Sequence, residues 1–471
     1  MRGHCFPYYC RTLLLAQALA FLSFSLTPSR TGEAKPLQNQ YEANPFVFAL
    51  AQRRPDERVG SIVAADVNND GLLDYLYTTP GSLGAYDHFG SVLWVKHVDI
   101  HLTGQAESEG LPGLHAPGVQ AGDVDGDGKT EVLFLTTDRR LIICDGATGQ
   151  EKSQAKPPVP EGVARWEHLL LCNLRGEGDR DVVLQATAEA DRYKLGRFVT
   201  ALAAENLQGE PLWATDHFRA LAHGPLRAAD LDGDGRDELC GLSLYDHDGT
   251  LLTDGDSPKE AWHIDSLFIY DVRPDLPGLE ALVLEEGSNH VMLLGAQGRI
   301  WRTHHERQEP QNAALGEFDL SRPGLEIWCR SRYDEYQKPW VFDAQGNVIV
   351  SYELSKVAPP DWTVKGVEEI SVIDWDGGAR QLAAAKERHE EGDVCIFDPM
   401  TGEFVQRFTE QAARLYVADV SGDWREELVV VNGSEIHIYW NPAPNPDPNR
   451  PPLWTHDYYR RSKMNWNYYS P

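Results

Sequence analysis

The sequence has little cysteine and too few basic residues to balance its acids. Only 7 of its 471 residues are cysteines, and 43 Lys and Arg stand against 72 Asp and Glu, a formal net charge of −29. Proteins that bind nucleic acid or anionic membranes generally carry the opposite charge, so we expect neither kind of partner. After residue 26 no segment is apolar enough to cross a bilayer.

The N-terminal region has the pattern of a secretory signal. Arg11 precedes an apolar run over 13–26, and a polar stretch follows over 27–36. This run is short for a membrane span, although a single anchor is the alternative. We expect residues 1–34 to be a signal peptide and the protein to be secreted or periplasmic. The five cysteines that follow each lie alone in an apolar run, which indicates buried thiols.

An acidic, glycine-containing turn recurs along the chain. Successive copies start about 50 residues apart, the period of a propeller blade or a solenoid turn. Three copies are well formed, a fourth keeps the outer acids and four are worn; in chain order the starts are Asp66, Asp123, Asn173, Asp230, Asp271, Asp319, Asp374 and Asp419.

Glycine-bearing hairpins alternate with these acidic turns, for example at Gly90, Gly249 and Gly346. Each unit therefore predicts four antiparallel strands. Eight units predict an all-β fold, an eight-bladed β-propeller that forms a single domain over residues 44–471, with blades starting near 60, 117, 167, 224, 265, 313, 368 and 413. Two packed β-domains are the alternative, but no linker interrupts the period. We expect residues 44–52 to add a strand to the first or last blade, and the tail 454–471 to support ring closure.

The four better turns carry oxygen ligands suited to Ca²⁺. Acids or amides at turn positions 1, 3 and 5, often Gly at 6, and an acid at 9 converge when the turn closes. The expected ligands are Asp66, Asn68, Asp70, Asp74, Asp123, Asp125, Asp127, Glu131, Asp230, Asp232, Asp234, Glu238, Asp419, Ser421, Asp423 and Glu427. Several structural Ca²⁺ sites are thus predicted. The alternative, preferred for the worn copies, is a hairpin satisfied by its own backbone.

A basic, histidine-rich face is predicted on the side opposite these turns. If each acidic turn joins strands 1 and 2 of a blade, the segments leading into strand 1 lie on the other face, with the loops between strands 2 and 3. The leading segments carry His115, His168, His223 and His263. In so acidic a chain, such a concentration of basic groups is what an anionic ligand would need.

Two segments and the chain's end resemble a known family. The run 262–267 before the turn 271–280, its echo at 319–326, and the closing stretch 452–460 resemble rhamnogalacturonan lyases. The resemblance implies a secreted, Ca²⁺-containing, eight-bladed propeller that cleaves rhamnose–uronate linkages by β-elimination. Related propeller lyases that act on rhamnose–glucuronate linkages fit equally well.

β-Elimination requires a base near neutral pKa and a group that neutralises the uronate carboxylate. His223 and His263 are the leading base or acid candidates, followed by His168 and His115, and Tyr333 is a candidate proton donor to the leaving oxygen. The expected substrate contacts are Arg330, Arg332, Lys338, Lys386, Arg388, His389, Tyr193, Trp166 and Trp262. The expected partner is an acidic polysaccharide or oligosaccharide, bound by a monomer.

Two other functions remain open. The main one is a non-catalytic, Ca²⁺-dependent propeller of the FG-GAP type that binds glycans or proteins. Such a module does not need a basic axial face. A quinoprotein dehydrogenase is the third, but the regular Trp of its docking turns and two adjacent Cys are missing.

Overall fold

The computed structural model describes residues 41–52, 60–102, 117–188, 196–255, 263–305, 309–331, 337–388 and 391–466. The predicted signal peptide lies outside these ranges. Residues 36–471 form one compact unit. No helix in the described ranges is long and apolar enough to span a membrane.

The described chain is all-β apart from short helices. Six sheets have four antiparallel strands each, and within each sheet the strands pair in chain order. The first three sheets contain β2 (Ile62–Ala65), β3 (Asp74–Thr79), β4 (Ser82–Tyr86) and β5 (Val92–His97); β6 (Val119–Gly122), β7 (Glu131–Leu135), β8 (Leu141–Asp145) and β9 (Glu151–Ala155); and β10 (His168–Cys172), β11 (Asp181–Ala186), β12 (Phe198–Ala203) and β13 (Trp213–Thr215).

The next three contain β14 (Arg227–Ala229), β15 (Glu238–Cys240), β16 (Leu244–Tyr245) and β17 (Leu251–Thr253); β18 (Ile264–Tyr270), β19 (Glu280–Glu285), β20 (His290–Gly295) and β21 (Gly298–His304); and β22 (Pro310–Gly316), β23 (Glu326–Ser331), β24 (Trp340–Phe342) and β25 (Val348–Ser351). The predicted four-stranded antiparallel sheets are therefore confirmed.

A seventh sheet has seven strands in the order β1-β31-β30-β29-β28-β27-β26. Its members are β1 (Phe46–Ala49), β26 (Val367–Ile373), β27 (Leu382–Glu387), β28 (Gly392–Phe397), β29 (Phe404–Ala418), β30 (Glu427–Asn432) and β31 (Glu435–Tyr439). The first part of β29 pairs with β28 and its last part with β30. Strand β1 pairs with β31, so the expected N-terminal strand joins the last strands of the chain.

Burial decreases from the inner strands to the outer ones. All residues of β7, β10 and β19 are buried, whereas four of the five residues of β9 are exposed. The inner strands are apolar on both faces because each sheet packs against a sheet on either side. The cysteines follow this pattern: all five in the described ranges are buried with free thiols, as predicted.

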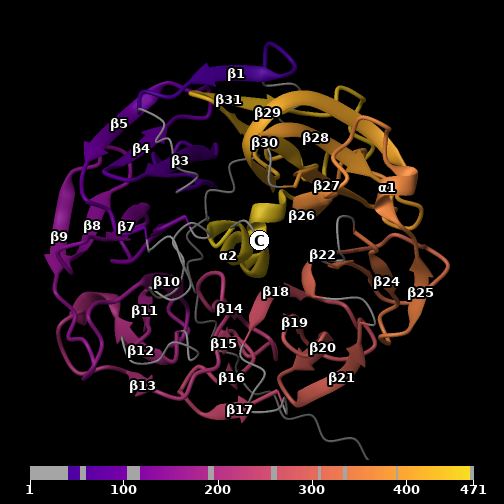
Figure 1. Ribbon diagram of the computed structural model, residues 1–471. Helices are drawn as coiled ribbons and strands as arrows, with labels where there is room; N and C mark the ends of the chain where they lie inside the picture. Colours follow the sequence, from indigo (N-terminus) through magenta and orange to yellow (C-terminus); the bar gives the residue numbers. More distant parts are fainter. Residues whose placement is uncertain are drawn as a thin grey trace, which may run out of the picture. The chain divides into compact units, whose positions relative to one another are not determined.

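The sheets follow one another around helix α2 (Asp457–Met464), an arrangement typical of β-propellers (Figure 1). Helix α2 contacts the inner strands β2, β6, β14 and β18. Its buried Arg461 lies 2.7 Å from Asp237 and 3.2 Å from Asp179, and Lys463 lies 2.9 Å from Glu426. The C-terminal segment thus links several sheets at the centre, as expected for a role in ring closure. The remaining helices are η3 (Ala204–Asn206), α1 (Leu354–Val357) and η4 (Leu453–Thr455).

Candidate functional site beside the central helix

The acidic turns and the histidine-bearing segments lie at opposite ends of the inner strands. Strand β10 begins at His168 and ends at Cys172, directly before the turn that starts at Asn173. The same order holds for β14, which follows His223 and ends at Ala229, before Asp230. In the six four-stranded sheets the acidic turns join the first two strands, as the sequence predicted, while the turn 419–427 joins β29 and β30 within the seven-stranded sheet.

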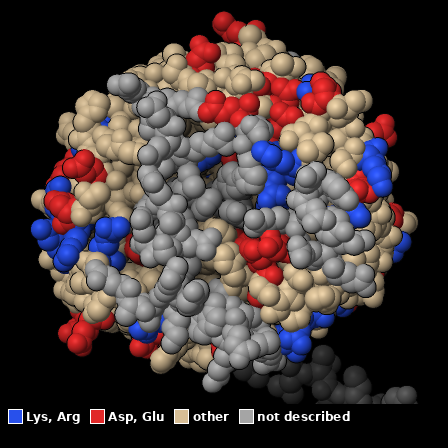
Figure 2. All heavy atoms as spheres, viewed as in Figure 1, with Lys and Arg blue, Asp and Glu red and all other residues tan. Residues whose placement is uncertain are grey.

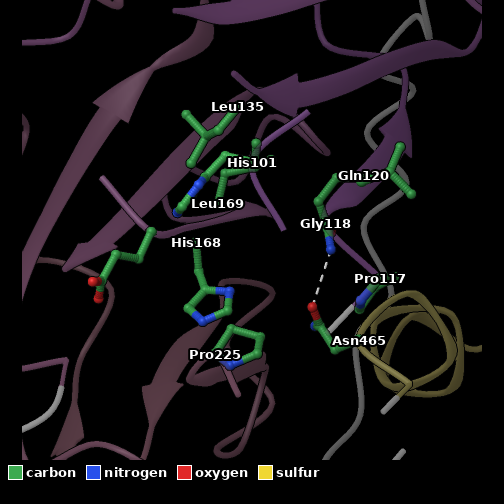
Figure 3. A pocket seen from close by; sticks show the side chains of 11 residues that line it. His101, Pro117, Gly118, Gln120, Leu135, His168, Leu169, Pro225 and Asn465 are labelled. Atoms are coloured by element: carbon green, nitrogen blue, oxygen red, sulfur yellow. Dashed lines mark hydrogen bonds between the residues drawn. The ribbon is translucent and has the colours of Figure 1, made fainter. Parts of the chain in front are cut away.

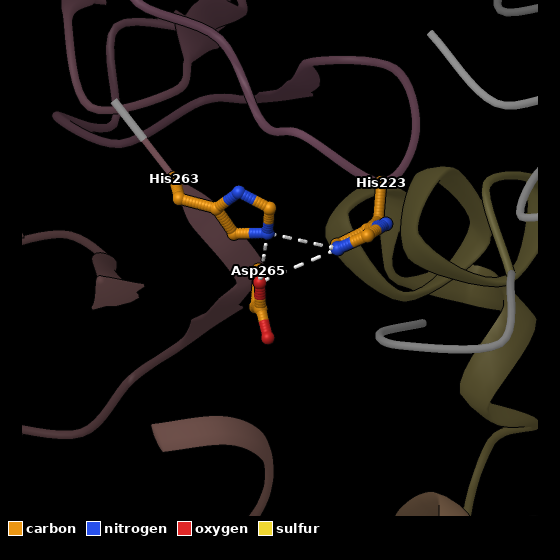
Figure 4. A group of neighbouring side chains, drawn as sticks. All are labelled: His223, His263 and Asp265. Atoms are coloured by element: carbon orange, nitrogen blue, oxygen red, sulfur yellow. Dashed lines mark hydrogen bonds and ion pairs between the residues drawn. The ribbon is translucent and has the colours of Figure 1, made fainter. Parts of the chain in front are cut away.

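Two of the predicted histidines meet at a buried carboxylate (Figure 4). The Nε2 atoms of His223 and His263 are 3.1 Å apart, and they lie 3.4 and 3.0 Å from Oδ1 of Asp265. His263 directly precedes β18, Asp265 is its second residue, and His223 comes from the segment before β14. The carboxylate of Asp265 is completely buried.

A second carboxylate completes this group. Oε2 of Glu286, which follows β19, lies 3.2 Å from Nε2 of His263. Burial, together with the charge of Asp265, raises the pKa of Glu286 to about 9. Burial also acts to raise the pKa of Asp265, but the contacts with His223 and His263 outweigh it and lower that pKa. We call His223, His263, Asp265 and Glu286 the two-histidine site.

Three side chains of the two-histidine site offer ligand atoms that could hold a metal ion. Both carboxylate oxygens of Asp265 are buried and make no contact with hydrogen-bond geometry, although imidazole nitrogens lie close to Oδ1. One ligand atom from each of His223, His263 and Asp265 lies within 4.8 Å of the others. Imidazole nitrogen and carboxylate oxygen are common ligands of divalent metals.

The sequence analysis missed Asp265 and Glu286. Residues two apart on a strand point to the same face, so the spacing of His263 and Asp265 was a usable signal. Glu286 offers no such signal in the sequence. Glu286 reaches the site because the preceding residue, Glu285 in β19, pairs with Ile264 in the adjacent strand β18.

Two predicted cations lie on the next sheets around the ring. The hydroxyl of Ser266 donates to the backbone carbonyl of Gln311 in β22. The side-chain oxygen of Gln311 accepts from Nη2 of Arg330 at 2.8 Å and from Nη2 of Arg388 at 3.4 Å. Gln311, on a strand next to the two-histidine site, therefore accepts hydrogen bonds from both guanidinium groups. Figure 2 shows Asp and Glu near β18, and Lys and Arg near β26, on one face.

Other predicted substrate contacts have structural partners. Lys386 is buried, and its ammonium lies 2.8 Å from the carboxylate of Glu368. The buried ring of Trp166 packs in the hydrophobic core and donates to the carbonyl of Pro158. Lys338 is half-buried, and its backbone N–H donates to Ser331. The described side-chain contacts of Lys386 and Trp166 place these two residues in the framework of the fold.

His168 lines a small pocket whose lining contains none of the residues of the two-histidine site (Figure 3). The pocket is also lined by His101, Gln120, Pro225 and Asn465, the last directly after α2. Burial, then the nearby His101 and Arg227, lowers the pKa of His168 to about 3. A histidine with so low a pKa is a weak base at neutral pH, so its position does not favour proton abstraction.

Six predicted site residues lie outside the described ranges: His115, Tyr193, Trp262, Arg332, Tyr333 and His389.

The acidic turns differ in how their carboxylates are satisfied. In the turn 230–238, backbone N–H groups of Gly233 and Gly235 donate to Asp230, but Oε1 of the buried Glu238 has no hydrogen-bond partner. Burial raises the pKa of Glu238 to about 8. In the turn 66–74, the amide of Asn68 donates to the corresponding oxygen of Asp74.

The turn 419–427 lies beneath the C-terminal segment. Asp419 and Glu427 are buried, the backbone N–H of Leu453 donates to Asp419 at 2.8 Å, and the indole of Trp454 donates to its carbonyl. Oδ1 of Asp419 has no hydrogen-bond partner. Any cation in this turn would be covered by protein.

A ring of four-stranded antiparallel sheets around a central helix is the arrangement of a β-propeller. The sequence model of the C-terminal domain of rhamnogalacturonan lyase family 11 matches residues 212–470, more than half of the chain. The protein belongs to this family, and the resemblance found in its sequence is confirmed.

Two curated relatives come from Bacillus subtilis. The rhamnogalacturonan endolyase YesW is 24% identical over 428 residues, which cover 78% of this chain and 62% of the relative. The rhamnogalacturonan exolyase YesX is 24% identical over 430 residues, with coverage of 77% and 65%. The chain thus spans less than two thirds of the length of either relative.

Two solved structures have the same fold. Exotype rhamnogalacturonan lyase YesX superimposes with a TM-score of 0.68 at 18% identity, covering 90% of this chain and 80% of its own. A Bacillus licheniformis rhamnogalacturonan lyase of family PL11 gives a TM-score of 0.63 at 18% identity, with coverage of 92% and 82%.

Proposed function

We propose that the protein is a secreted polysaccharide lyase that cleaves rhamnose–uronate linkages by β-elimination. The observation that carries this proposal is the convergence of His223, His263 and Asp265 beside the pair of arginines held by Gln311. Both relatives named above are rhamnogalacturonan lyases, one endo-acting and one exo-acting. An acidic polysaccharide is the proposed substrate.

The two-histidine site is proposed to hold a divalent metal ion through His223, His263, Asp265 and Glu286. A metal bound there would neutralise the uronate carboxylate and so make the neighbouring C5 proton more acidic. The buried carboxylate of Asp265 holds the two imidazoles in place. His223 and His263 would then be metal ligands and not the groups that transfer protons. The C5 proton would pass to another base, for which His115 is the remaining candidate from the sequence.

Arg388 is proposed to bind the substrate, with Arg330 supporting it. A guanidinium can bind a carboxylate through two parallel hydrogen bonds, which fixes its plane as well as neutralising its charge. Arg388 is the more exposed of the two, at 8% against 1%. Gln311 would keep both side chains oriented before substrate arrives.

We further propose eight blades and calcium in the acidic turns. Because β29 pairs along its first part with β28 and along its last part with β30, it would serve two successive blades. The turn 230–238 is the best supported calcium site, since Oε1 of Glu238 is buried without a hydrogen-bond partner and Asp230, Asp232 and Asp234 each offer one oxygen within 4.8 Å of the others. Sites at 66–74 and 419–427 are proposed with it.

Elimination can be distinguished from hydrolysis by its product. It leaves a 4,5-unsaturated uronate, which absorbs ultraviolet light. The test is to incubate the full chain, loaded in turn with Ca²⁺, Mn²⁺ or Zn²⁺, with rhamnogalacturonan and with rhamnose-capped glucuronate glycans. Rising absorbance with one substrate class supports the lyase and identifies its uronate.

Matched variants localise the activity. His263→Ala and Asp265→Asn should abolish the absorbance change, while His217→Ala, at a side chain that is 83% exposed, should keep it. Glycan binding without any absorbance change, with every metal, would overturn the lyase in favour of a glycan-binding propeller.

A further inference from the structure

The acidic turn 123–131 contains a lysine ammonium among its carboxylates. Nζ of Lys152 lies 2.6 Å from Asp125, 2.8 Å from Glu131 and 3.5 Å from Asp127. Asp123, Asp125 and Asp127 each offer one oxygen within 4.8 Å of the others. The ammonium thus contacts three of the four acids that the sequence assigns to a calcium ion.

Lys152 reaches the turn because of a β-bulge. In six sheets the pairing of the third and fourth strands shifts by one residue near the hairpin, which leaves one residue of the outer strand without a partner across the sheet. A bulge changes the direction of the side chain that it carries. The bulge residues are Leu93, Lys152, Leu252, Ile300, Ile349 and Val405. Lys152 is the charged member of this otherwise aliphatic set.

Two of the aliphatic bulge residues occur in sheets whose turn ends in a buried acid with an unsatisfied oxygen, whereas in the turn 66–74, whose sheet carries Leu93, the amide of Asn68 donates to Asp74. Where the bulge carries Leu252 or Ile349, the last acid of that turn, Glu238 or Glu326, keeps a buried Oε1 without a hydrogen-bond partner. Where it carries Lys152, Oε1 of Glu131 receives the ammonium at 2.8 Å. The lysine therefore supplies positive charge where the other two turns leave an oxygen unsatisfied.

A neighbouring worn turn uses the same solution with a different residue. Arg175, inside the turn 173–181, places its Nε 2.6 Å from Oδ1 of Asp181, the last acid of that turn. Glu205 binds the far end of the guanidinium at 2.8 Å. An internal cation in this turn indicates that the fold tolerates a side chain in place of a metal.

We propose that the ammonium of Lys152 is the permanent counter-ion of the turn 123–131, so that this turn folds without calcium. A calcium ion would have to displace the ammonium from Asp125 and Glu131, because two cations at such short distances repel each other. The acidic turns would then fall into two classes, one closed by side chains and one, including 230–238, that remains open to exchangeable metal.

Counting bound Ca²⁺ on the full chain tests this proposal without measuring lyase activity. Equilibrium dialysis followed by elemental analysis should show that Lys152→Leu, which copies Leu93 and Leu252, binds one Ca²⁺ per chain more than the wild type. Lys129→Leu removes the same charge from an exposed position of the same turn and should leave the count unchanged. Adding Asp125→Asn to Lys152→Leu should remove the gained ion.

A second variant keeps the test decisive if Lys152→Leu does not fold. Asp125→Asn alone, in a chain that retains Lys152, should bind as many Ca²⁺ ions as the wild type. Loss of one ion in this variant would overturn the proposal, since the turn would then hold calcium beside its lysine. An unchanged count in folded Lys152→Leu would overturn it as well.

Discussion

The Nε2 atoms of His223 and His263 lie 3.1 Å apart, although 40 positions separate the residues in the chain. Both also approach the same oxygen of Asp265, which is buried. Only one proton can lie between two imidazole nitrogens, so protons alone satisfy this group poorly. A divalent ion with the nitrogens and carboxylates as ligands, as proposed above, would satisfy all of them at once.

Metal removal is therefore expected to inactivate the protein. Dialysis against a chelator should reduce lyase activity at least about 100-fold, the range seen when a group that stabilises the transition state is lost. Readdition of one divalent ion should restore it. His223→Ala should be inactive before dialysis and should stay inactive after metal is added, whereas His217→Ala should behave as the wild type. Full activity of His223→Ala in chelator would contradict the site.

Replacement of Gln311 is expected to weaken substrate binding. Gln311→Leu removes the oxygen to which both Arg330 and Arg388 donate, so the guanidiniums lose their common orientation. The KM for a uronate oligosaccharide should rise about tenfold, equivalent to about 1.4 kcal/mol, with a smaller change in kcat.

A matched variant separates this effect from a general loss of stability. Gln154→Leu removes the acceptor of Arg140 on the exposed strand β9 and should leave KM unchanged. Steady-state kinetics of both variants make the comparison. A fall in kcat at constant KM in Gln311→Leu would assign Gln311 to the chemical step instead.

The sequence predicted the sheets far better than the site. The repeated acidic turns and hairpins join strands that pair with each other and lie within about 15 residues in the chain. Such local pairing can be predicted from the sequence. The pair His223 and His263 was also found, because both precede a first strand and those segments share one face. Gln311 was missed because its position depends on which neighbouring sheets contact each other, and Glu286 was missed because the sequence does not give the register in which β19 pairs with β18.

Several predicted residues turned out to have a different environment. Lys386 and Trp166 have the chemistry of substrate contacts, but one pairs with Glu368 and the other packs in the core. Nothing in the sequence separates a buried ion pair from an exposed cation on the same strand end. The lysine at the turn 123–131 was overlooked for a related reason: only the bulge directs Lys152 back onto Asp125 and Glu131.

The buried histidines of the pocket predict a loss of stability in acid. Burial, then the nearby Arg165, lowers the pKa of His101 to about 4, and the pKa of His168 is lowered to about 3. Below the unfolded value of about 6.5, the unfolded chain binds protons that the folded chain does not. The free energy of unfolding should therefore fall by about 1.4 kcal/mol per pH unit for each histidine between about pH 6 and pH 4.

Urea unfolding at several pH values measures this slope. The pKa of Glu238 is raised, so the folded chain binds a proton more readily there, and from about pH 8 downward this residue makes the free energy of unfolding rise as the pH falls. The pH dependence of a variant is therefore compared with that of the wild type. His168→Gln should be less sensitive to acid than the wild type, and His217→Gln should match the wild type. Identical slopes for His168→Gln and the wild type would show that His168 is protonated in the folded chain.

The central helix is expected to contribute strongly to stability through Arg461. Its guanidinium is 5% exposed and contacts Asp237, Asp179 and the carbonyl of Leu171, which belong to two different sheets and their turns. Arg461→Met would leave the buried carboxylate of Asp237 without its cation, while Asp179 keeps its contact with Arg460. Breaking a buried ion pair in this way costs about 3–5 kcal/mol. Chemical denaturation should show a loss of this size, with Arg139→Met, at an exposed position, as the control. Adding Asp237→Asn should recover part of the loss, because it removes the carboxylate that is left without a cation. A loss below about 1 kcal/mol, as for exposed ion pairs, would mean that α2 does not tie the sheets together through this arginine.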